Sequence, residues 1–174
     1  SEVTIEGDDG AFAINLGLLY QVGEATRVGV AWRQGFDYDV EGDADFDRSS
    51  SCNADPFCRG ATRDASVDAA IELPSTLSVA LFHQVSDRLA LMGDVTWYEW
   101  SVLQEVPIER SDGNELSRLE LEYDDTFRYN FGGRYRYDEK WTFRAGLAYD
   151  AAPQTSDEFV TPRIPDGDRT WLSA

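Results

Sequence analysis

A period-two alternation of bulky apolar residues with small or polar ones constrains this chain more than any other feature. In residues 11–22 the even positions carry large apolar side chains, from Phe12 to Val22, and the odd positions are mostly small or polar. The same alternation recurs in residues 27–38, 76–85, 126–137 and 141–150. Successive side chains of a strand point to opposite faces, so this pattern predicts strands with one apolar and one polar face. The chain is therefore expected to be all-β.

Short and long connections alternate between the predicted strands. The strands are expected at about residues 11–22, 27–41, 64–85, 88–106, 121–137, 141–151 and 169–174. Long loops are expected at 42–63, 107–120 and 152–168. Pro74 should mark a bend, bulge or strand start, because proline cannot donate to a strand ladder. In an antiparallel up-and-down meander all short turns lie at one end, as in outer-membrane β-barrels. One partial β-barrel domain over 1–174 is predicted.

The composition argues against a nucleic-acid-binding protein, a disordered chain and a protein with membrane-spanning helices. The chain has 174 residues, with 33 acidic and 15 basic side chains and a formal net charge of −18. A nucleic-acid binder usually carries a basic surface, so no nucleic-acid partner is expected. The hydrophobic fraction of 42% is too high for a disordered acidic chain. No apolar run approaches the roughly 18 residues that a membrane helix needs.

The alternation alone leaves open which face points outward. The polar face is expected to carry Arg33, Asp37, Asp94, Arg128, Arg134, Arg136, Arg144 and Asp150. A soluble barrel or sandwich would bury the bulky face, whereas a membrane barrel would turn it to lipid. Tyr20, Tyr137 and Trp141 flank short turns, as aromatic side chains do at a lipid–water interface. The membrane barrel is the favoured reading, with the soluble β-barrel or sandwich as its alternative.

Chemistry-bearing motifs are sparse. Cys52 and Cys58 flank a predicted turn at Asp55-Pro56, so a local disulfide is expected, with two free thiols as the alternative. His83 is the only histidine, and neither a GxSxG nor a P-loop motif is present. The sequence therefore predicts no enzyme activity, no catalytic residue and no cofactor.

Two groups of charged residues are candidate sites. Asp39, Glu41 and Asp43 belong to an alternating acidic run that could hold Ca²⁺, although a solvated strand is the favoured alternative. The candidate ligand-binding residues are Arg128, Arg134, Arg144, Phe82 and Trp100. A guanidinium binds a carboxylate with two parallel hydrogen bonds. Pairing of the arginines with acids inside a polar lumen is the alternative, and Trp100 could instead join an aromatic girdle.

Four segments together resemble the FadL/TodX-type outer-membrane transporters of long-chain fatty acids and other hydrophobic compounds. They are residues 15–46, 72–101, 135–153 and 163–174, in the order in which the family has them. The resemblance implies a 14-stranded barrel with an N-terminal hatch in its lumen, passive uptake by binding and diffusion, and extracellular long loops. It also implies a Gram-negative outer membrane with its lipid and lipopolysaccharide as surroundings, a hydrophobic small molecule as cargo, and no obligate protein partner.

The chain departs from that family in lacking the hatch, the early strands and the final strands. About seven strands of the barrel are therefore expected, as an interior-to-C-terminal portion of a longer protein. Two alternative functions remain: a soluble β-barrel module that binds lipid or glycan, and a structural outer-membrane barrel without transport.

Overall fold

The computed structural model of the chain contains two compact units. Residues 2–47, 50–61, 64–110, 113–154 and 166–174 are described. One unit, residues 13–36, 73–104 and 121–174, contains a seven-stranded sheet and is called the seven-stranded unit. The other, residues 1–12, 37–72 and 105–120, contains a five-stranded sheet and is called the five-stranded unit.

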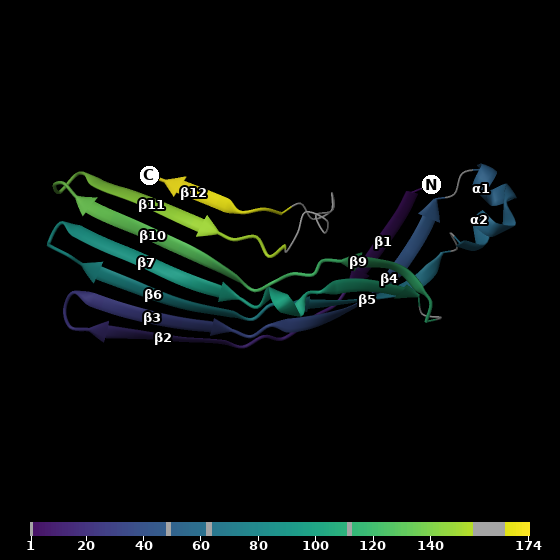
Figure 1. Cartoon of the computed structure of the whole chain (residues 1–174), viewed down its shortest axis with the longest axis horizontal. Coiled ribbons are helices and arrows are strands. Elements are labelled where there is room, and N and C mark those ends of the chain that lie inside the picture. Colours follow the sequence, from purple (N-terminus) through teal and green to yellow (C-terminus); the bar gives the residue numbers. More distant parts are fainter. Residues whose placement is uncertain (1, 48–49, 62–63, 111–112, 155–165) are drawn as a thin grey trace. The chain divides into compact units, whose positions relative to one another are not determined.

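The seven-stranded sheet is an antiparallel meander. Its strands are β2 (Asn15–Val22), β3 (Thr26–Arg33), β6 (Thr76–Gln84), β7 (Leu89–Tyr98), β10 (Thr126–Arg136), β11 (Thr142–Asp150) and β12 (Arg169–Ser173). They lie side by side in the order β12-β11-β10-β7-β6-β3-β2, and every neighbouring pair is antiparallel (Figure 1). One of these strands falls in each of the seven predicted ranges. The all-β antiparallel fold class is confirmed.

Side chains near the strand ends hold the short turns of this sheet. Gln21 donates from its amide to the carbonyls of Gly23 and Thr26, at 2.6 and 3.1 Å. Gly23 has a φ of +71°, a conformation that glycine adopts without strain. Gln84 makes the equivalent pair of bonds at the β6–β7 turn, and the Asp138 carboxylate accepts two backbone N–H bonds at the β10–β11 turn. Each hairpin register is thus fixed locally.

Just beyond the last pair of the β3–β6 ladder, Arg33 with Thr76, the two chain segments approach each other closely. Gly35 follows β3, and a Cβ there would lie 2.5 Å from the Leu73 carbonyl oxygen and 2.8 Å from the Ser75 nitrogen. Only glycine allows this close approach. Pro74 separates β5 from β6, which starts at Thr76, so this proline marks a strand start as the sequence predicted.

The five-stranded unit contains strands where the sequence predicted long loops. Its sheet has the order β1-β4-β5-β8-β9. The strands are β1 (Glu2–Asp8), β4 (Phe36–Asp47), β5 (Ala65–Leu73), β8 (Glu105–Arg110) and β9 (Glu115–Glu120). β4 runs into the predicted loop 42–63, and β8 and β9 form a hairpin across the predicted loop 107–120. The acidic residues suggested loops, but Val40, Ala44 and Phe46 continue the alternation between them and are at least half-covered. The predicted loop 152–168 lies mostly outside the described residues.

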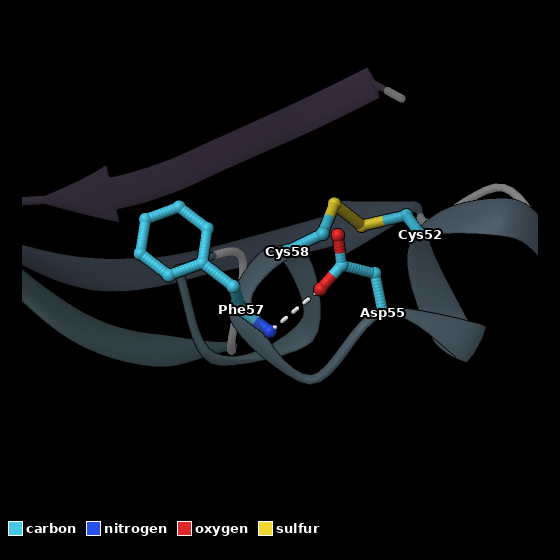
Figure 2. Close-up of a disulfide and its surroundings, with 4 residues drawn as sticks. All are labelled: Cys52, Asp55, Phe57 and Cys58. Atoms are coloured by element: carbon cyan, nitrogen blue, oxygen red, sulfur yellow. Dashed lines mark hydrogen bonds between the residues drawn. A yellow bond between two sulfur atoms is a disulfide. The ribbon is translucent and has the colours of Figure 1, made fainter.

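Two short helices carry the disulfide. α1 (Ser50–Ala54) and α2 (Pro56–Ala61) are joined by a bond between Cys52 and Cys58, whose Cα atoms are 5.2 Å apart (Figure 2). The Asp55 carboxylate accepts a hydrogen bond from the Phe57 backbone N–H at 2.9 Å, which stabilises the turn between the helices. Among the described residues no helix is long and apolar enough to cross a membrane.

Candidate functional site

The two faces of the seven-stranded sheet differ sharply. One face, called the apolar face, exposes large side chains such as Leu18 (69% exposed), Phe131 (60%) and Leu147 (49%). An apolar band of this extent is unfavourable in water and marks a surface that contacts lipid or protein. The opposite face, called the polar face, carries Arg33, Asp94, Arg128, Arg134, Arg136, Arg144 and Asp150. Asp37, the eighth residue predicted there, lies in the five-stranded unit.

Strand register arranges the polar face in rows, because directly paired residues of neighbouring strands share a face. One row runs Gly29, Ala80, Asp94, Asn130, Ala148 and Trp171. The next runs Arg27, Phe82, Met92, Gly132, Gly146 and Ser173. Half of the twelve residues in these two central rows are Gly, Ala or Ser, whereas the rows on either side of them carry several arginines.

A hollow of about 500 Å³ lies over these two central rows, and we call it the small-residue hollow. Its small lining residues are Gly29, Ala80, Gly132, Gly146 and Ala148, and its large apolar ones include Leu19, Phe82, Met92 and Trp171. A sheet position without a long side chain leaves space above the backbone, and Gly132 and Gly146 are directly paired in the β10–β11 register. Apolar walls with a few polar groups are typical of small-molecule sites.

Three of the polar side chains that line this hollow, Arg27, Asp94 and Asn130, already make contacts. Asn130 donates to the Asp94 carboxylate at 2.7 Å. The Arg27 guanidinium lies 4.5 Å from the centre of the Phe82 ring, a cation–π contact that fixes the ring in the hollow. The remaining lining is therefore available for apolar contact.

Arg134 and Arg144 lie in a second hollow, of about 550 Å³, towards the short turns. Its lining consists of Gln84, Asp87, Arg88, Arg134, Arg136, Thr142 and Arg144, and we call it the arginine hollow. Arg134 and Arg144 are directly paired in the β10–β11 register, an arrangement that is unfavourable for like charges. Arg136 donates to the Asp87 carbonyl oxygen at 2.8 Å.

Trp100 lies in a third, smaller hollow of about 160 Å³ near the ends of β7 and β11. It starts the short helix η1 (Trp100–Val102), and Tyr98 and Pro153 line the same hollow. The Trp100 ring packs edge-on against Tyr123, with 5.9 Å between ring centres. Next to it, hydrogen bonds from Ser101 hold the pKa of the Asp125 carboxyl below its ordinary value. These contacts fix the helix against the start of β10.

Arg128 lies apart from both of the other predicted arginines. It is half-buried on the polar face, in register with Thr96 and Asp150, and its Nε is buried without a hydrogen-bond partner. The five predicted ligand residues thus occupy four separate places: Phe82 in the small-residue hollow, Arg134 and Arg144 in the arginine hollow, and Trp100 and Arg128 elsewhere.

The acidic candidates Asp39, Glu41 and Asp43 lie on the exposed side of β4. Asp43 accepts a hydrogen bond from the Ser66 hydroxyl at 3.1 Å. In the described part of the chain, no three carboxylate, histidine or cysteine side chains gather as a metal site would require.

Sequence reasoning missed Met92, Trp171 and Arg88. Phe82 departs from the alternation of its strand, and Met92, its direct partner in the β6–β7 register, also puts a bulky apolar side chain on the polar face. Two such departures facing each other are a signal that could have located the hollow. To predict that Trp171 and Arg88 line the hollows, one must know the register of a short terminal strand and of a turn, and the sequence alone does not give it.

Comparisons with known proteins agree with this architecture. The family model described as "Outer membrane protein transport protein (OMPP1/FadL/TodX)" matches residues 3–174. The "Long-chain fatty acid transport protein" of Escherichia coli O6:H1 (strain CFT073) is 32% identical, over 98% of this chain and 39% of that protein. "Outer membrane protein P1" of Haemophilus influenzae (strain Rd) is 35% identical, over 93% of this chain and 33% of that protein.

A solved structure matches as well. The crystal structure of a Pseudomonas aeruginosa FadL homologue superposes with a TM-score of 0.79 at 28% identity, over 91% of this chain and 38% of that one. The chain thus spans between a third and two fifths of the proteins it matches. Nearly all of the chain is covered by a family model of outer-membrane transport proteins, and its relatives are named as such. The chain therefore belongs to the OMPP1/FadL/TodX family, and its place is the outer membrane of a Gram-negative bacterium.

Proposed function

We propose that the whole protein containing this chain takes up hydrophobic molecules across the outer membrane by binding and diffusion. The E. coli relative is named for long-chain fatty acids, and we extend that cargo class to this protein as part of the proposal. No covalent chemistry and no energy source are invoked. Membership of an outer-membrane family removes the soluble lipid- or glycan-binding module as an alternative.

The small-residue hollow carries the proposal. The inner face of a membrane barrel is normally polar, and this face follows that rule on both sides of the hollow. Within the hollow, however, Phe82, Met92 and Trp171 form apolar walls around a floor of small residues. A barrel that served only as a scaffold would have no need of apolar walls on an otherwise polar inner face, whereas a hydrophobic cargo needs them.

The apolar face supports the membrane part of the proposal. Its side chains are exposed in the chain itself, and lipid would cover them in the outer membrane. Trp141 and Tyr137 lie beside the β10–β11 turn and are about 60% exposed, as expected for side chains at the lipid–water interface. We propose that this face contacts outer-membrane lipid, including lipopolysaccharide.

Filling the small-residue hollow tests the transport function. Ala80→Phe in the whole protein would place a ring over the floor of the hollow, opposite Asp94. Val79→Phe is the matched control, because Val79 is the next residue and lies on the apolar face, 48% exposed. Uptake of labelled oleate is measured in cells that lack the gene and carry each variant.

We expect Ala80→Phe to reduce uptake about tenfold, equivalent to the loss of about 1.4 kcal/mol of binding. Val79→Phe should leave uptake unchanged. Equal uptake by both variants, with both assembled in the outer membrane, would exclude the hollow as part of the path. No difference between cells with and without the gene would favour the scaffold role.

A further inference from the structure

The arginine hollow adjoins the small-residue hollow along two strands. Gly132 and Arg134 are two residues apart on β10, and Gly146 and Arg144 are two residues apart on β11. Residues at this spacing point to the same face and lie about 7 Å apart along the strand. One continuous surface therefore passes from an apolar hollow to a cationic one.

The charges of the arginine hollow are not balanced. Arg88, Arg134, Arg136 and Arg144 line it, and Asp87 is its single acidic lining residue. The hydrogen bond from Arg136 to Asp87 goes to the backbone carbonyl, not to the carboxylate. In the described part of the chain none of these four guanidiniums forms an ion pair. Such a group of cations favours an anionic ligand.

The row on the other side of the small-residue hollow is different. There Arg128 is paired in register with Asp150, which is in turn paired with Arg169, and Arg169 forms an ion pair with Asp166. Cations and acids alternate in that row, so its net attraction for an anion is weaker. Positive charge is therefore greater on the side of the small-residue hollow that lies towards the short turns.

We propose that the arginine hollow binds the carboxylate head of an amphiphilic cargo whose apolar tail lies in the small-residue hollow. This rests on the transport function proposed above and adds an orientation: the head points towards the short turns. Arg134 and Arg144 are the specificity-determining pair, because two adjacent guanidiniums can each offer parallel N–H donors to one carboxylate. Arg88 and Arg136 add to the local positive potential.

The test compares two probes with the same tail on the purified whole protein in detergent. Dodecanoate carries the carboxylate, and dodecanol is its neutral counterpart. The variant is Arg134→Gln/Arg144→Gln. The control is Arg33→Gln, on the same face but outside both hollows, where the guanidinium donates to the Asn15 side chain at 3.0 Å. Binding of each probe is measured at equilibrium for every protein.

We expect the glutamine double variant to weaken dodecanoate binding at least tenfold and to leave dodecanol binding unchanged, because charge-assisted hydrogen bonds are lost and apolar contacts are not. Arg33→Gln should change neither. Arg134→Lys/Arg144→Lys should give an intermediate loss for dodecanoate, since lysine keeps the charge without the planar fork. This variant also provides the readout if the glutamine variant does not assemble.

Three results would overturn the inference. Equal weakening of both probes would mean that the arginines shape the hollow instead of reading the head group. Unchanged dodecanoate binding together with a lower thermal stability of the double variant would mean that an acidic segment of the whole protein occupies the arginine hollow. Unchanged binding and stability would mean that it is a solvated surface. Failure of the wild-type protein to bind either probe would instead count against the transport function itself.

Discussion

The two units of this chain share the alternation of strands but carry very different charge. The five-stranded unit holds 19 acidic and 5 basic side chains, so −14 of the net −18 belongs to it. The seven-stranded unit holds 14 acidic and 10 basic side chains. Among the described residues, almost all large apolar side chains that lie exposed belong to the seven-stranded unit, with Phe12 and Phe57 as the exceptions.

This contrast shows that alternation predicts a strand and not the medium around it. β4 and β6 both alternate, yet β4 exposes Asp39 and Glu41 where β6 exposes Val79 and Leu81. A strand that exposes carboxylates is compatible with water, and one that exposes branched apolar side chains is compatible with lipid. The two sheets have the same period-two pattern, so the charge of their exposed side chains is what distinguishes a sheet suited to water from one suited to lipid.

The largest difference between the two sheets is expected when the same charged side chain is placed on an exposed position of each. Val79 lies in the middle of β6, in register with Val30 and Val95 on the apolar face. Val79→Arg should lower the free energy of unfolding of the whole protein in lipid vesicles by about 2–4 kcal/mol, the cost of an arginine facing lipid near the bilayer midplane. Denaturant titration followed by tryptophan fluorescence measures it.

The matched change in the other sheet is Ala70→Arg. Ala70 is an exposed residue of β5 in the acidic unit, so the same side chain should change stability by less than about 0.5 kcal/mol. A similar large loss at both positions would show that the five-stranded sheet also faces an apolar medium.

The disulfide should have a smaller effect that stays within the five-stranded unit. The bond between Cys52 and Cys58 closes a short loop, which corresponds to about 2 kcal/mol of local stabilisation. In Cys52→Ser/Cys58→Ser we expect faster proteolysis within residues 50–61 and no change in the unfolding transition of the seven-stranded unit. Limited proteolysis followed by mass spectrometry measures the first, and denaturant titration the second.

Wild-type protein treated with reductant is the control for the serine variant, because it loses the bond and keeps both side chains. The two samples should be cleaved at the same rate. A shift of the whole unfolding transition in either sample would show that the helices stabilise more than their own segment.

The sequence predicted the seven-stranded sheet well because its signals are local. Hairpin turns such as that at Gly23, together with alternation over eight or more residues, define each strand and its register without knowledge of the rest. The acidic segments were predicted less well. Asp43 and Asp47 raised the polarity of the second half of β4 enough to suggest a loop from residue 42, although Ala44 and Phe46 kept its period.

The candidate site was harder to predict because it depends on register across several strands. Phe82 and Arg144 were identified by residue type, but nothing in one strand shows that Arg144 faces Arg134 or that Phe82 faces Met92. Residue type alone therefore did not show that the five predicted ligand residues lie in four separate places. To find such a site from sequence, one would have to search neighbouring strands for residues that depart from the alternation and are paired with each other.

The smallest effect is expected from the ion pairs of the β8–β9 hairpin. Arg118 lies 2.6 Å from a Glu105 oxygen and 2.7 Å from a Glu115 oxygen, and all three side chains are exposed. The hydrogen bond and charge of Arg118 hold the pKa of Glu115 below its ordinary value, so the stabilisation is complete above that ordinary pKa and disappears as the pH falls through the lowered one.

Arg118→Ala should therefore slightly increase amide exchange in the hairpin at neutral pH, and the difference from wild type should vanish at acid pH or in about 1 M salt. Amide hydrogen exchange of residues 105–120 measures it, with Arg33→Ala in the other sheet as control. A difference that persists at high salt would show that Arg118 acts through packing of its aliphatic stem. Compensation of the negative charge of this unit would then contribute little to the stability of the hairpin.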